Sequence, residues 1–328
     1  MAISTVSRVL NGGRSSDDAK QRVRSAISEL GYTPSLAAQS LVTGRAGCVG
    51  LAVNSTQSPW FSQIIWGVEE TLGPSRKSVL LASLMLHGRY DPSVVAAWIQ
   101  EARVDGLIFV RYSRRDEPLF DAASRKGLPL VLIAPDLAAP AHFTVRCDND
   151  KAGALVAEHL AELGHHRVAF AGGPRESADM RNRVKGLTRG LLAHGITLRR
   201  EDCWFGSSFA PETGIEYAKR FLAERAKQRP SAVVLGNDAM ALGFMRVVLQ
   251  YGLRVPEDVS VVGFDGVPEG ALAWPGLTTV VQPTREMAAN ACRSLLEAIQ
   301  GETSGAATSL EYGVEMVIRE STGRRAGF

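Results

Sequence analysis

The chain has 328 residues, which is too long for one ordinary domain, so two or three domains are expected. Hydrophobic residues make up 45% of it and charged residues 22%, which is typical of a soluble globular protein with sizeable cores. The formal net charge is only +3, so the overall charge does not by itself require nucleic acid as a partner.

The sequence gives no sign of a membrane protein, a secreted protein or a metal-binding protein. It lacks a run of ~20 apolar residues that could cross a membrane. It does not open with the charged and apolar segments of a signal peptide. The cysteines are scattered without CxxC or metal-ligand spacing: Cys48, Cys147, Cys203 and Cys292. We expect a cytoplasmic protein with reduced thiols and with neither a metal nor a membrane partner.

The first residues have the pattern of a helix that reads DNA. Residues 2–11 read AISTVSRVLN and precede a Gly12-Gly13 turn. On a helix, one face is apolar and the opposite face is polar and cationic: Val6, Val9 and Leu10 against Ser4, Arg8 and Asn11. A recognition helix needs one such face for packing and the other for base edges.

The first 45 residues are also locally basic. Six basic residues stand against three acidic ones: Arg8, Arg14, Lys20, Arg22, Arg24 and Arg45 against Asp17, Asp18 and Glu29. This balance suits phosphate contacts, although a solvated helix face would explain the charges equally well. Residues 17–30 predict a helix capped by Gly31, and residues 34–41 give a second short helical signal before a linker at 43–45.

From residue 48 onward, short apolar strands alternate with helices, and the series restarts after residue 148. This alternation predicts an α/β fold of two similar, doubly wound parallel-sheet halves. Strands are expected at 48–54, 78–83, 105–110, 129–133, 167–173, 203–205, 231–238 and 259–265, and helices at 61–72, 92–102, 117–126, 151–163, 183–194, 211–227 and 239–251.

The remaining segment, residues 277–321, is too short for a third domain. It predicts a strand at 277–283, a helix at 287–299 and one last strand at 310–320, and it is expected to cross between the two halves. Two expected strands end in polar residues, at Asn237-Asp238 and at Asp265. Because ligands of such folds bind beyond the carboxyl ends of the strands, a cleft for a small polar ligand is expected.

Two rival classes share this fold. A nucleotide-dependent enzyme is disfavoured because the glycines at 172–173 lack GxGxxG spacing and no GxxxxGK[ST] motif occurs. Arg183 and Asp265 could form an acid–base pair, but no nucleophile or cofactor motif accompanies them, so no cofactor is expected. A solute-binding protein for uptake would have the same core, but it would carry a signal peptide and would not need a DNA-reading helix.

Several segments, in order along the whole chain, resemble the LacI/GalR family of bacterial transcriptional regulators. They are TVSRVLN at 5–11, Tyr32-x-Pro34, AxSL at 38–41, VDGLIF at 104–109, DN at 148–149, LGHHRVAF at 163–170, ND-x-MALG at 237–243, GLRVPEDVSVVGFDG at 252–266 and LTTVVQP at 277–283. The resemblance implies a homodimer with a helix-turn-helix head, a hinge helix and a two-lobed effector-binding core like that of periplasmic sugar-binding proteins.

The resemblance also implies the domain boundaries. The partial helix-turn-helix head is expected at 1–33 and the hinge helix with its linker at 34–46. The first lobe of the core would comprise 47–146 plus about 283–308, and the second lobe 147–282 plus about 309–322.

For DNA, the resemblance places recognition-helix roles on Ile3, Ser4, Thr5, Arg8 and Asn11. Arg8 is the strongest of these, because a guanidinium can hold the O6 and N7 atoms of guanine. Ser4 could equally cap the helix, and Ile3 could serve packing alone. Leu41 matches a hinge-helix leucine that wedges into the minor groove; the alternative is a core position.

For the effector, the resemblance implies contacts from Trp60, Phe61, Arg183, Phe209, Asn237, Asp265 and Gln282. An arginine fork, an amide and a carboxylate suit sugar hydroxyls, and an aromatic ring can stack on a sugar or purine. Plain core packing is the alternative for the aromatic residues, more so for Phe61 than for Trp60.

Arg111 departs from the family pattern, which has a small residue or proline there, and the expected carboxylate after the next strand is displaced to Asp136. These changes would make the cleft more cationic, so we hypothesise an effector with an acidic group, such as a sugar acid or sugar phosphate. The equally favoured alternative is that Arg111 pairs with a structural carboxylate outside the cleft.

The resemblance implies allosteric repression of a palindromic operator. Effector binding would change the angle between the lobes and so the stability of the hinge segment on DNA. The resemblance matches the opening helix to the second helix of a three-helix head. In such a head, five aliphatic side chains would pack against a first helix: Val6, Val9, Leu10, Val23 and Ile27. We expect weak or absent operator binding for the chain as written, or a start upstream of Met1.

Overall fold

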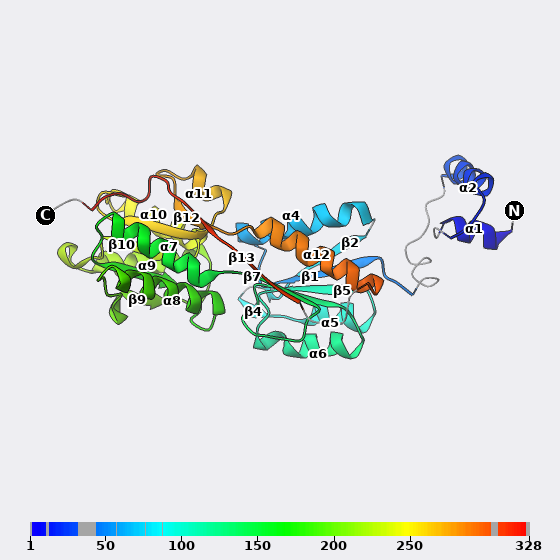
Figure 1. Ribbon diagram of the computed structural model, residues 1–328, viewed down its shortest axis with the longest axis horizontal. Helices are drawn as coiled ribbons and strands as arrows, with labels where there is room; N and C mark the ends of the chain where they lie inside the picture. Colours follow the sequence, from blue (N-terminus) through cyan, green and yellow to red (C-terminus); the bar gives the residue numbers. More distant parts are fainter. Residues whose placement is uncertain are drawn as a thin grey trace.

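Two α/β lobes and a separate pair of helices make up the protein (Figure 1). The computed structural model describes residues 2–10, 13–31, 44–56, 58–75, 77–86, 88–302 and 308–325. The expected hinge helix at 34–41 lies outside these ranges. The two-lobed, parallel-sheet fold class predicted from the sequence is confirmed.

The first lobe is built on a six-stranded, all-parallel sheet in the order β13-β7-β6-β5-β1-β2. Helices α4 and α12 cover one face and helices α5 and α6 the other (Figure 1). The bounds are β1 Cys48–Val53, α4 Pro59–Leu72, β2 Ser78–Ser83, the hairpin β3 Met85–Leu86 and β4 Arg89–Tyr90, α5 Ser93–Gln100, β5 Gly106–Val110, α6 Glu117–Arg125, β6 Leu130–Ile133, β7 Phe143–Cys147, α12 Thr284–Gln300 and β13 Thr308–Tyr312.

The second lobe is built on a sheet in the order β14-β12-β11-β10-β8-β9, parallel except for the edge strand β14. Helices α7 and α8 lie against each other on one side and α9 and α10 on the other. The bounds are α7 Asn149–Glu162, β8 Val168–Gly172, α8 Ala178–Ala193, β9 Cys203–Phe205, α9 Pro211–Ala223, β10 Ala232–Leu235, α10 Asp238–Gln250, β11 Ser260–Asp265, α11 Pro268–Leu272, β12 Thr278–Val281 and β14 Glu315–Val317.

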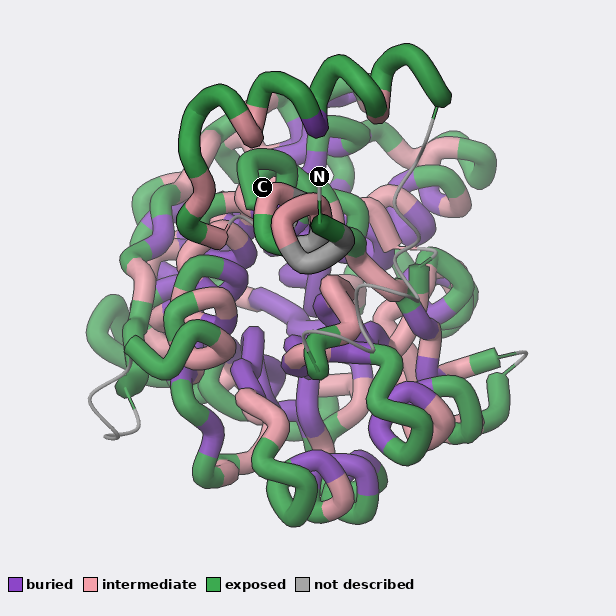
Figure 2. Tube along the Cα trace, turned by 90° about the vertical axis from the view of Figure 1, so that its right-hand side faces the viewer, coloured by how far each residue is buried: buried purple, intermediate pink, exposed green. Residues whose placement is uncertain are grey.

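The chain crosses between the lobes after β7, after β12, and between β13 and β14. The expectation of one last strand at 310–320 is wrong, because β13 joins the first sheet and β14 the second. The last crossing therefore lies after Tyr312 and not at about residue 308, and Gly313 stands in the break. Figure 2 shows that the buried residues gather inside the lobes.

The head comprises α1 Ile3–Leu10 and α2 Asp17–Leu30. The hydroxyl of Ser16 caps α2 by accepting from the Ala19 amide at 3.3 Å, and Gly31 ends it in the left-handed conformation, as predicted. Val23 is buried, whereas the other residues of α2 are half-buried or exposed.

The start of the first lobe is anchored by one carboxylate. Asp105, which immediately precedes β5, accepts the backbone N–H groups of Ala46 at 2.6 Å and Gly47 at 3.1 Å. The ammonium of Lys77 lies 2.6 Å from the same carboxylate. These bonds fix the point where the linker from the head enters the sheet. None of the described helices is long and apolar enough to cross a membrane.

Substituting Gly186 with alanine is expected to lower the free energy of unfolding by about 1–3 kcal/mol. Helices α7 and α8 touch through their backbones, and a Cβ at Gly186 would overlap the carbonyl oxygen of Asp150. Gly73→Ala is the matched control, because a Cβ there meets nothing within 4 Å and the backbone is already helical. Urea denaturation measures both; equal midpoints for the two variants would contradict close packing of α7 against α8.

Acidification is expected to destabilise the second lobe through His165. Its Nδ1 lies 2.8 Å from the Ser231 hydroxyl and its Nε2 3.2 Å from the Gly323 carbonyl oxygen, and burial lowers its pKa to about 4. Between pH 6.5, the ordinary pKa of a histidine, and about pH 4, His165 binds a proton in the unfolded chain but stays neutral in the folded protein. The free energy of unfolding therefore falls as the pH drops from about 6.5 to 4.

Melting temperatures of the wild type and His165→Gln between pH 7.5 and pH 5 test this assignment. The variant is expected to lose part of the acid-induced fall. An identical pH dependence of both proteins would show that His165 is not responsible.

Candidate ligand-binding cleft

A cavity of about 1500 Å³ lies between the carboxyl ends of the two sheets. All eight residues that the sequence predicts for the effector site line this one cavity: Trp60, Phe61, Arg111, Arg183, Phe209, Asn237, Asp265 and Gln282. They come from both lobes, from strand ends and from the helices and loops that lie beside them.

Arg183 is held inside the second lobe by α8 and is only 3% exposed. Its Nε donates to the Asn149 Oδ1 at 2.7 Å and its Nη1 to the Gly236 carbonyl oxygen at 2.5 Å. Its Nη2 lies 3.8 Å from an Asp265 carboxylate oxygen, and the guanidinium lies 4.6 Å from the Phe264 ring centre. These contacts fix the direction of the fork.

Asp265 ends β11 with a backbone φ of 117°, which a non-glycine residue rarely adopts. Its Oδ1 accepts from the Gln282 amide at 2.7 Å. Burial raises the pKa of Asp265, and the neighbouring Arg183 opposes that rise. The carboxyl group and the Gln282 amide thus form a joined, buried polar pair at the floor of the cleft.

Asn237 positions the aromatic residue of the cleft. Its Oδ1 caps α10 by accepting from the Met240 amide at 2.9 Å, and its Nδ2 donates to the Phe209 carbonyl oxygen at 3.0 Å. Both side-chain groups of Asn237 therefore stabilise the local backbone, a structural role that the sequence did not indicate. The Phe209 ring remains half-buried in the cleft.

Trp60 and Phe61 open helix α4 at the edge of the cavity, with ring centres 5.0 Å apart in an edge-to-face arrangement. Both also pack into the core, as the alternative interpretation held. The Trp60 side chain is 6% exposed, yet its indole N–H has no hydrogen-bond partner among the described residues. A buried donor without an acceptor is costly, so a ligand oxygen would stabilise this site.

Arg111 lies in the cleft and is only 8% exposed. Its Nη1 donates to Asp179 at 2.6 Å, while its Nη2 donates to Ser177 at 2.6 Å and lies 3.2 Å from Asp136. Burial opposes its charge, but Asp179 and Asp136 outweigh that effect and raise its pKa. Its partners are cleft carboxylates, so the alternative of a structural partner outside the cleft is wrong.

The cleft does not have the positive charge that the sequence led us to expect. Among the described lining residues, the six arginines are accompanied by six carboxyl groups: Arg111, Arg115, Arg175, Arg183, Arg200 and Arg220 with Asp136, Glu176, Asp179, Glu201, Glu212 and Asp265. Because Arg111 is already paired with two of these carboxylates, the premise for an acidic effector fails.

Sequence reasoning missed the residues that connect these groups. Asn149 donates to Asp179 at 2.9 Å and accepts from Arg183, so it joins the two buried arginines through one amide. Asp179 and Ser177 lie at the start of α8, which begins five residues before the predicted helix. The DN pair at 148–149 was noticed only as a family motif, not as a site.

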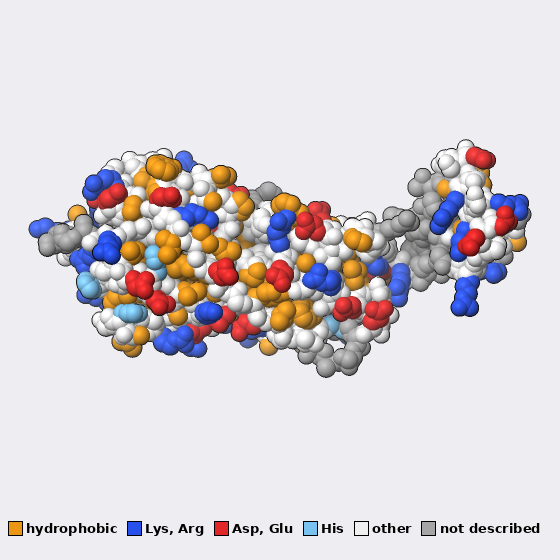
Figure 3. Space-filling view, turned by 45° about the horizontal axis from the view of Figure 1, so that its top comes forward, with side chains coloured by type: hydrophobic (Ala, Val, Ile, Leu, Met, Phe, Trp, Pro, Cys, Tyr) orange, Lys and Arg blue, Asp and Glu red, His pale blue; other side chains and the backbone are white. Residues whose placement is uncertain are grey.

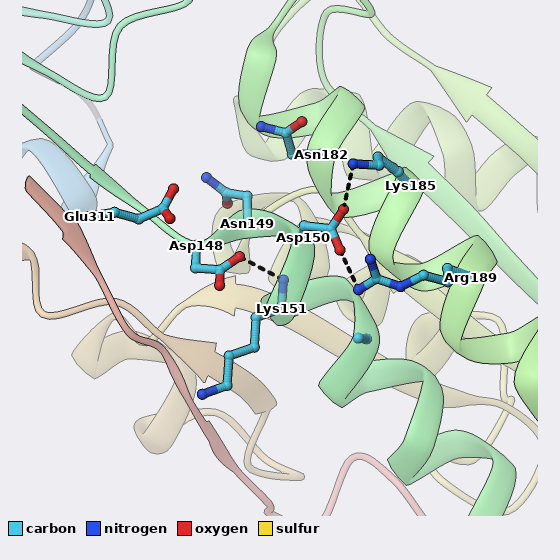
Figure 4. A pocket seen from close by; sticks show the side chains of 9 residues that line it. Asp148, Asn149, Asp150, Lys151, Asn182, Lys185, Arg189 and Glu311 are labelled. Atoms are coloured by element: carbon cyan, nitrogen blue, oxygen red, sulfur yellow. Dashed lines mark hydrogen bonds and ion pairs between the residues drawn. The ribbon is translucent and has the colours of Figure 1, made fainter. Parts of the chain in front are cut away.

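A second, smaller cavity of about 610 Å³ lies behind Asn149, between the N-terminus of α7, α8 and β13 (Figure 4). Asp150 pairs there with Lys185 at 3.1 Å and with Arg189, and Asp148 caps α7 by accepting from the Lys151 amide at 2.8 Å. Asp150 therefore has two cationic partners in this cavity. No group of His, Cys, Asp and Glu among the described residues is arranged to hold a metal ion.

On the head, Ile3, Ser4 and Thr5 lie in the first turn of α1, and the Arg8 side chain is exposed. Helix α1 ends at Leu10, and beyond it Gly13 donates its N–H to the Arg8 carbonyl oxygen at 2.7 Å. Asn11 and Leu41 lie outside the described residues. The DNA-reading roles of all six residues remain predictions.

Comparison with known proteins covers both parts of the chain. Residues 2–35 match the family model described as bacterial regulatory proteins, lacI family. Residues 157–322 match the model described as periplasmic binding protein-like domain. Across 98% of this chain and 95% of the relative, 30% of residues are identical to the HTH-type transcriptional repressor PurR of Photobacterium profundum.

Two solved structures show similar folds over almost the whole chain. The transcriptional regulator CelR in complex with cellobiose is 31% identical with a TM-score of 0.75, over 98% of this chain and 96% of that one. The Lac repressor dimer bound to operator and the anti-inducer ONPF is 26% identical with a TM-score of 0.81, over 98% of this chain and 95% of that one.

Proposed function

The chain belongs to the LacI family of bacterial regulatory proteins, and we propose that it is a dimeric repressor controlled by a neutral saccharide. It is a DNA-binding transcriptional regulator that responds to a small-molecule effector, and its relatives are regulators and not enzymes. A protein that reads operator DNA works beside the chromosome, so the proposal places it in the cytoplasm.

The observation that carries the choice of effector is the cleft. Its buried polar groups include the Arg183 fork, carboxylates and a joined Asp265–Gln282 pair, which suit hydroxyls that both donate and accept. Phe209 offers a half-buried ring, and the Trp60 N–H needs an acceptor. The pairing of Arg111 with two cleft carboxylates favours a neutral sugar, and CelR, which is 31% identical, was solved with cellobiose.

A homodimer is supported by exposed apolar residues on α4 and β2 and at the end of α11. These elements lie along one long side of the molecule (Figure 1). Leu272 and Trp274, at the end of α11 and just after it, are 85% and 86% exposed, and Trp66 of α4 is half exposed. Figure 3 looks onto this side and shows hydrophobic side chains along both lobes. Large apolar side chains that are exposed along one side are typical of an interface.

Sedimentation equilibrium tests the dimer. We expect twice the mass of the 35.2 kDa chain and a shift toward the monomer in Trp274→Glu. Leu192→Glu is the matched control, since Leu192 is an exposed apolar residue of α8 on the second lobe. A monomeric wild type would contradict the homodimer.

A thermal-shift screen of neutral sugars, sugar acids and sugar phosphates tests the effector class, because a ligand of the folded state raises the melting temperature. Selection from random DNA with and without the sugar found then tests regulation, and it also measures how strongly the chain binds operator. Stabilisation by a sugar acid alone, or binding without any effect on the selected DNA, would contradict the proposal.

A further inference from the structure

The proposed function leaves Arg111 unexplained. It follows β5 of the first lobe, but Asp179 and Ser177, two of its three hydrogen-bond partners, belong to the second lobe. Asp136 strengthens the same junction, because its Oδ1 lies 3.2 Å from the Arg111 Nη2 and also accepts the Ala178 backbone N–H of α8 at 2.9 Å. One buried guanidinium therefore ties the lobes together inside the cleft.

The same guanidinium covers the aromatic ring of the site. Its Cζ atom lies 4.5 Å from the centre of the Phe209 ring, within the range of a favourable cation–π contact. This is also the distance at which a flat ligand group would stack on that ring. Arg111 thus occupies space on Phe209 that a stacked ligand would need.

The backbone of Arg111 is strained in this position. Its φ is +60°, in the left-handed region that favours glycine. Ala134 after β6 and Asp265 at the end of β11 also have positive φ values, of 46° and 117°. Three of the four non-glycine residues with this geometry in the described part of the chain therefore face the cleft or flank it, where backbone strain often marks function.

We propose that Arg111 is a specificity-determining residue that acts as a tethered occupant of the effector cleft. An effector reaches the Phe209 face by displacing the guanidinium, and it must then supply hydrogen-bond donors to Asp179 and Asp136. Hydroxyl-rich or amine-bearing saccharides meet this demand, whereas a carboxylate or phosphate would face two carboxylates. The claim that an effector displaces Arg111 rests on the proposed function. The claim that Arg111 bridges the two lobes rests only on the contacts within this chain.

Small-angle X-ray scattering of the full-length protein tests the bridge. Arg111→Met removes the guanidinium but keeps a long side chain, and we expect a larger radius of gyration as the lobes separate. Arg175→Met is the matched control: its guanidinium also lines the cavity, but it covers Phe205 within the second lobe at 4.5 Å. An unchanged radius in Arg111→Met, or equal changes in both variants, would overturn the bridge.

Chemical rescue tests whether a free molecule can take the place of the side chain. Arg111→Gly suits the left-handed backbone and leaves a space the shape of a guanidinium ion. Millimolar guanidinium chloride is expected to raise the melting temperature of Arg111→Gly but not of the wild type. Sodium acetate at equal ionic strength is expected to give no rise, because it offers an anion to Asp179 and Asp136.

The double variant Arg111→Gly/Asp179→Asn is expected to lose the guanidinium effect, since the main partner is gone. Equal responses of Arg111→Gly to guanidinium and acetate, or rescue that survives Asp179→Asn, would overturn the tethered-occupant proposal. If Arg111→Gly does not fold, the scattering comparison still decides the bridge. Neither experiment uses operator or effector, so a failure of operator binding would overturn the proposed function and leave this inference standing.

Discussion

Replacing Arg183 with methionine is expected to abolish effector binding and to lower the free energy of unfolding by about 3–5 kcal/mol. The guanidinium is buried, and its removal leaves the Asn149 amide oxygen and the Gly236 carbonyl oxygen without their donor. Asp265 loses its nearest positive charge at the same time. Buried groups left without partners are the most costly kind of loss.

Urea denaturation and effector titration measure the two effects separately. Arg181→Met is the matched control, because Arg181 lies on the same helix but is exposed, and its replacement is expected to change stability by less than about 0.5 kcal/mol. If Arg183→Met binds the effector as the wild type does, Arg183 is a structural residue and not part of the effector site.

Replacing Arg8 with alanine is expected to weaken binding to the preferred operator by about 1–3 kcal/mol and to relax the preference at one base position. The exposed side chain of Arg8 lies near the end of α1, on the polar face predicted from the sequence. A guanidinium that holds one guanine contributes to discrimination between bases and not only to attraction to phosphate.

Selection from random DNA with the wild type and the variant compares the two base preferences. Arg24→Ala, which removes the same charge from the exposed face of α2, is the control and is expected to weaken all sequences alike. An unchanged preference in Arg8→Ala would contradict the assignment of α1 as the recognition helix.

The sheets could be predicted because buried parallel strands are continuous apolar runs. The sequence CVGLAV forms β1, GLIFV forms β5 and AVVL forms β10, close to the expected ranges. Strand β7, FTVRC, was not predicted, because alternating polar residues interrupt its apolar run. The final run was read as one strand because no local signal shows that β13 and β14 pair in different sheets.

Asn237 and Asp265 could be predicted from their place at strand ends, which meet in any such fold, whereas the other cleft residues were implied by the family resemblance. Their partners could not, because the partners are set by tertiary structure. Arg111 and Asp179 are 68 positions apart, and no pattern indicates that they touch. The hypothesis of a cationic cleft failed for this reason: the sequence shows the gain of an arginine but not which carboxylates neutralise it.

Strand β5 has a different fixed attachment at each end. Asp105, at one end, accepts the amides of Ala46 and Gly47, where the chain arrives from the head. Arg111, at the other end, holds the second lobe. An extended segment of this length spans about 20 Å and cannot stretch, because its bonds and its sheet pairing fix its rise per residue. The strand therefore connects Arg111 rigidly to the entry point of the linker, and we expect an axial displacement of Arg111 to reach that point.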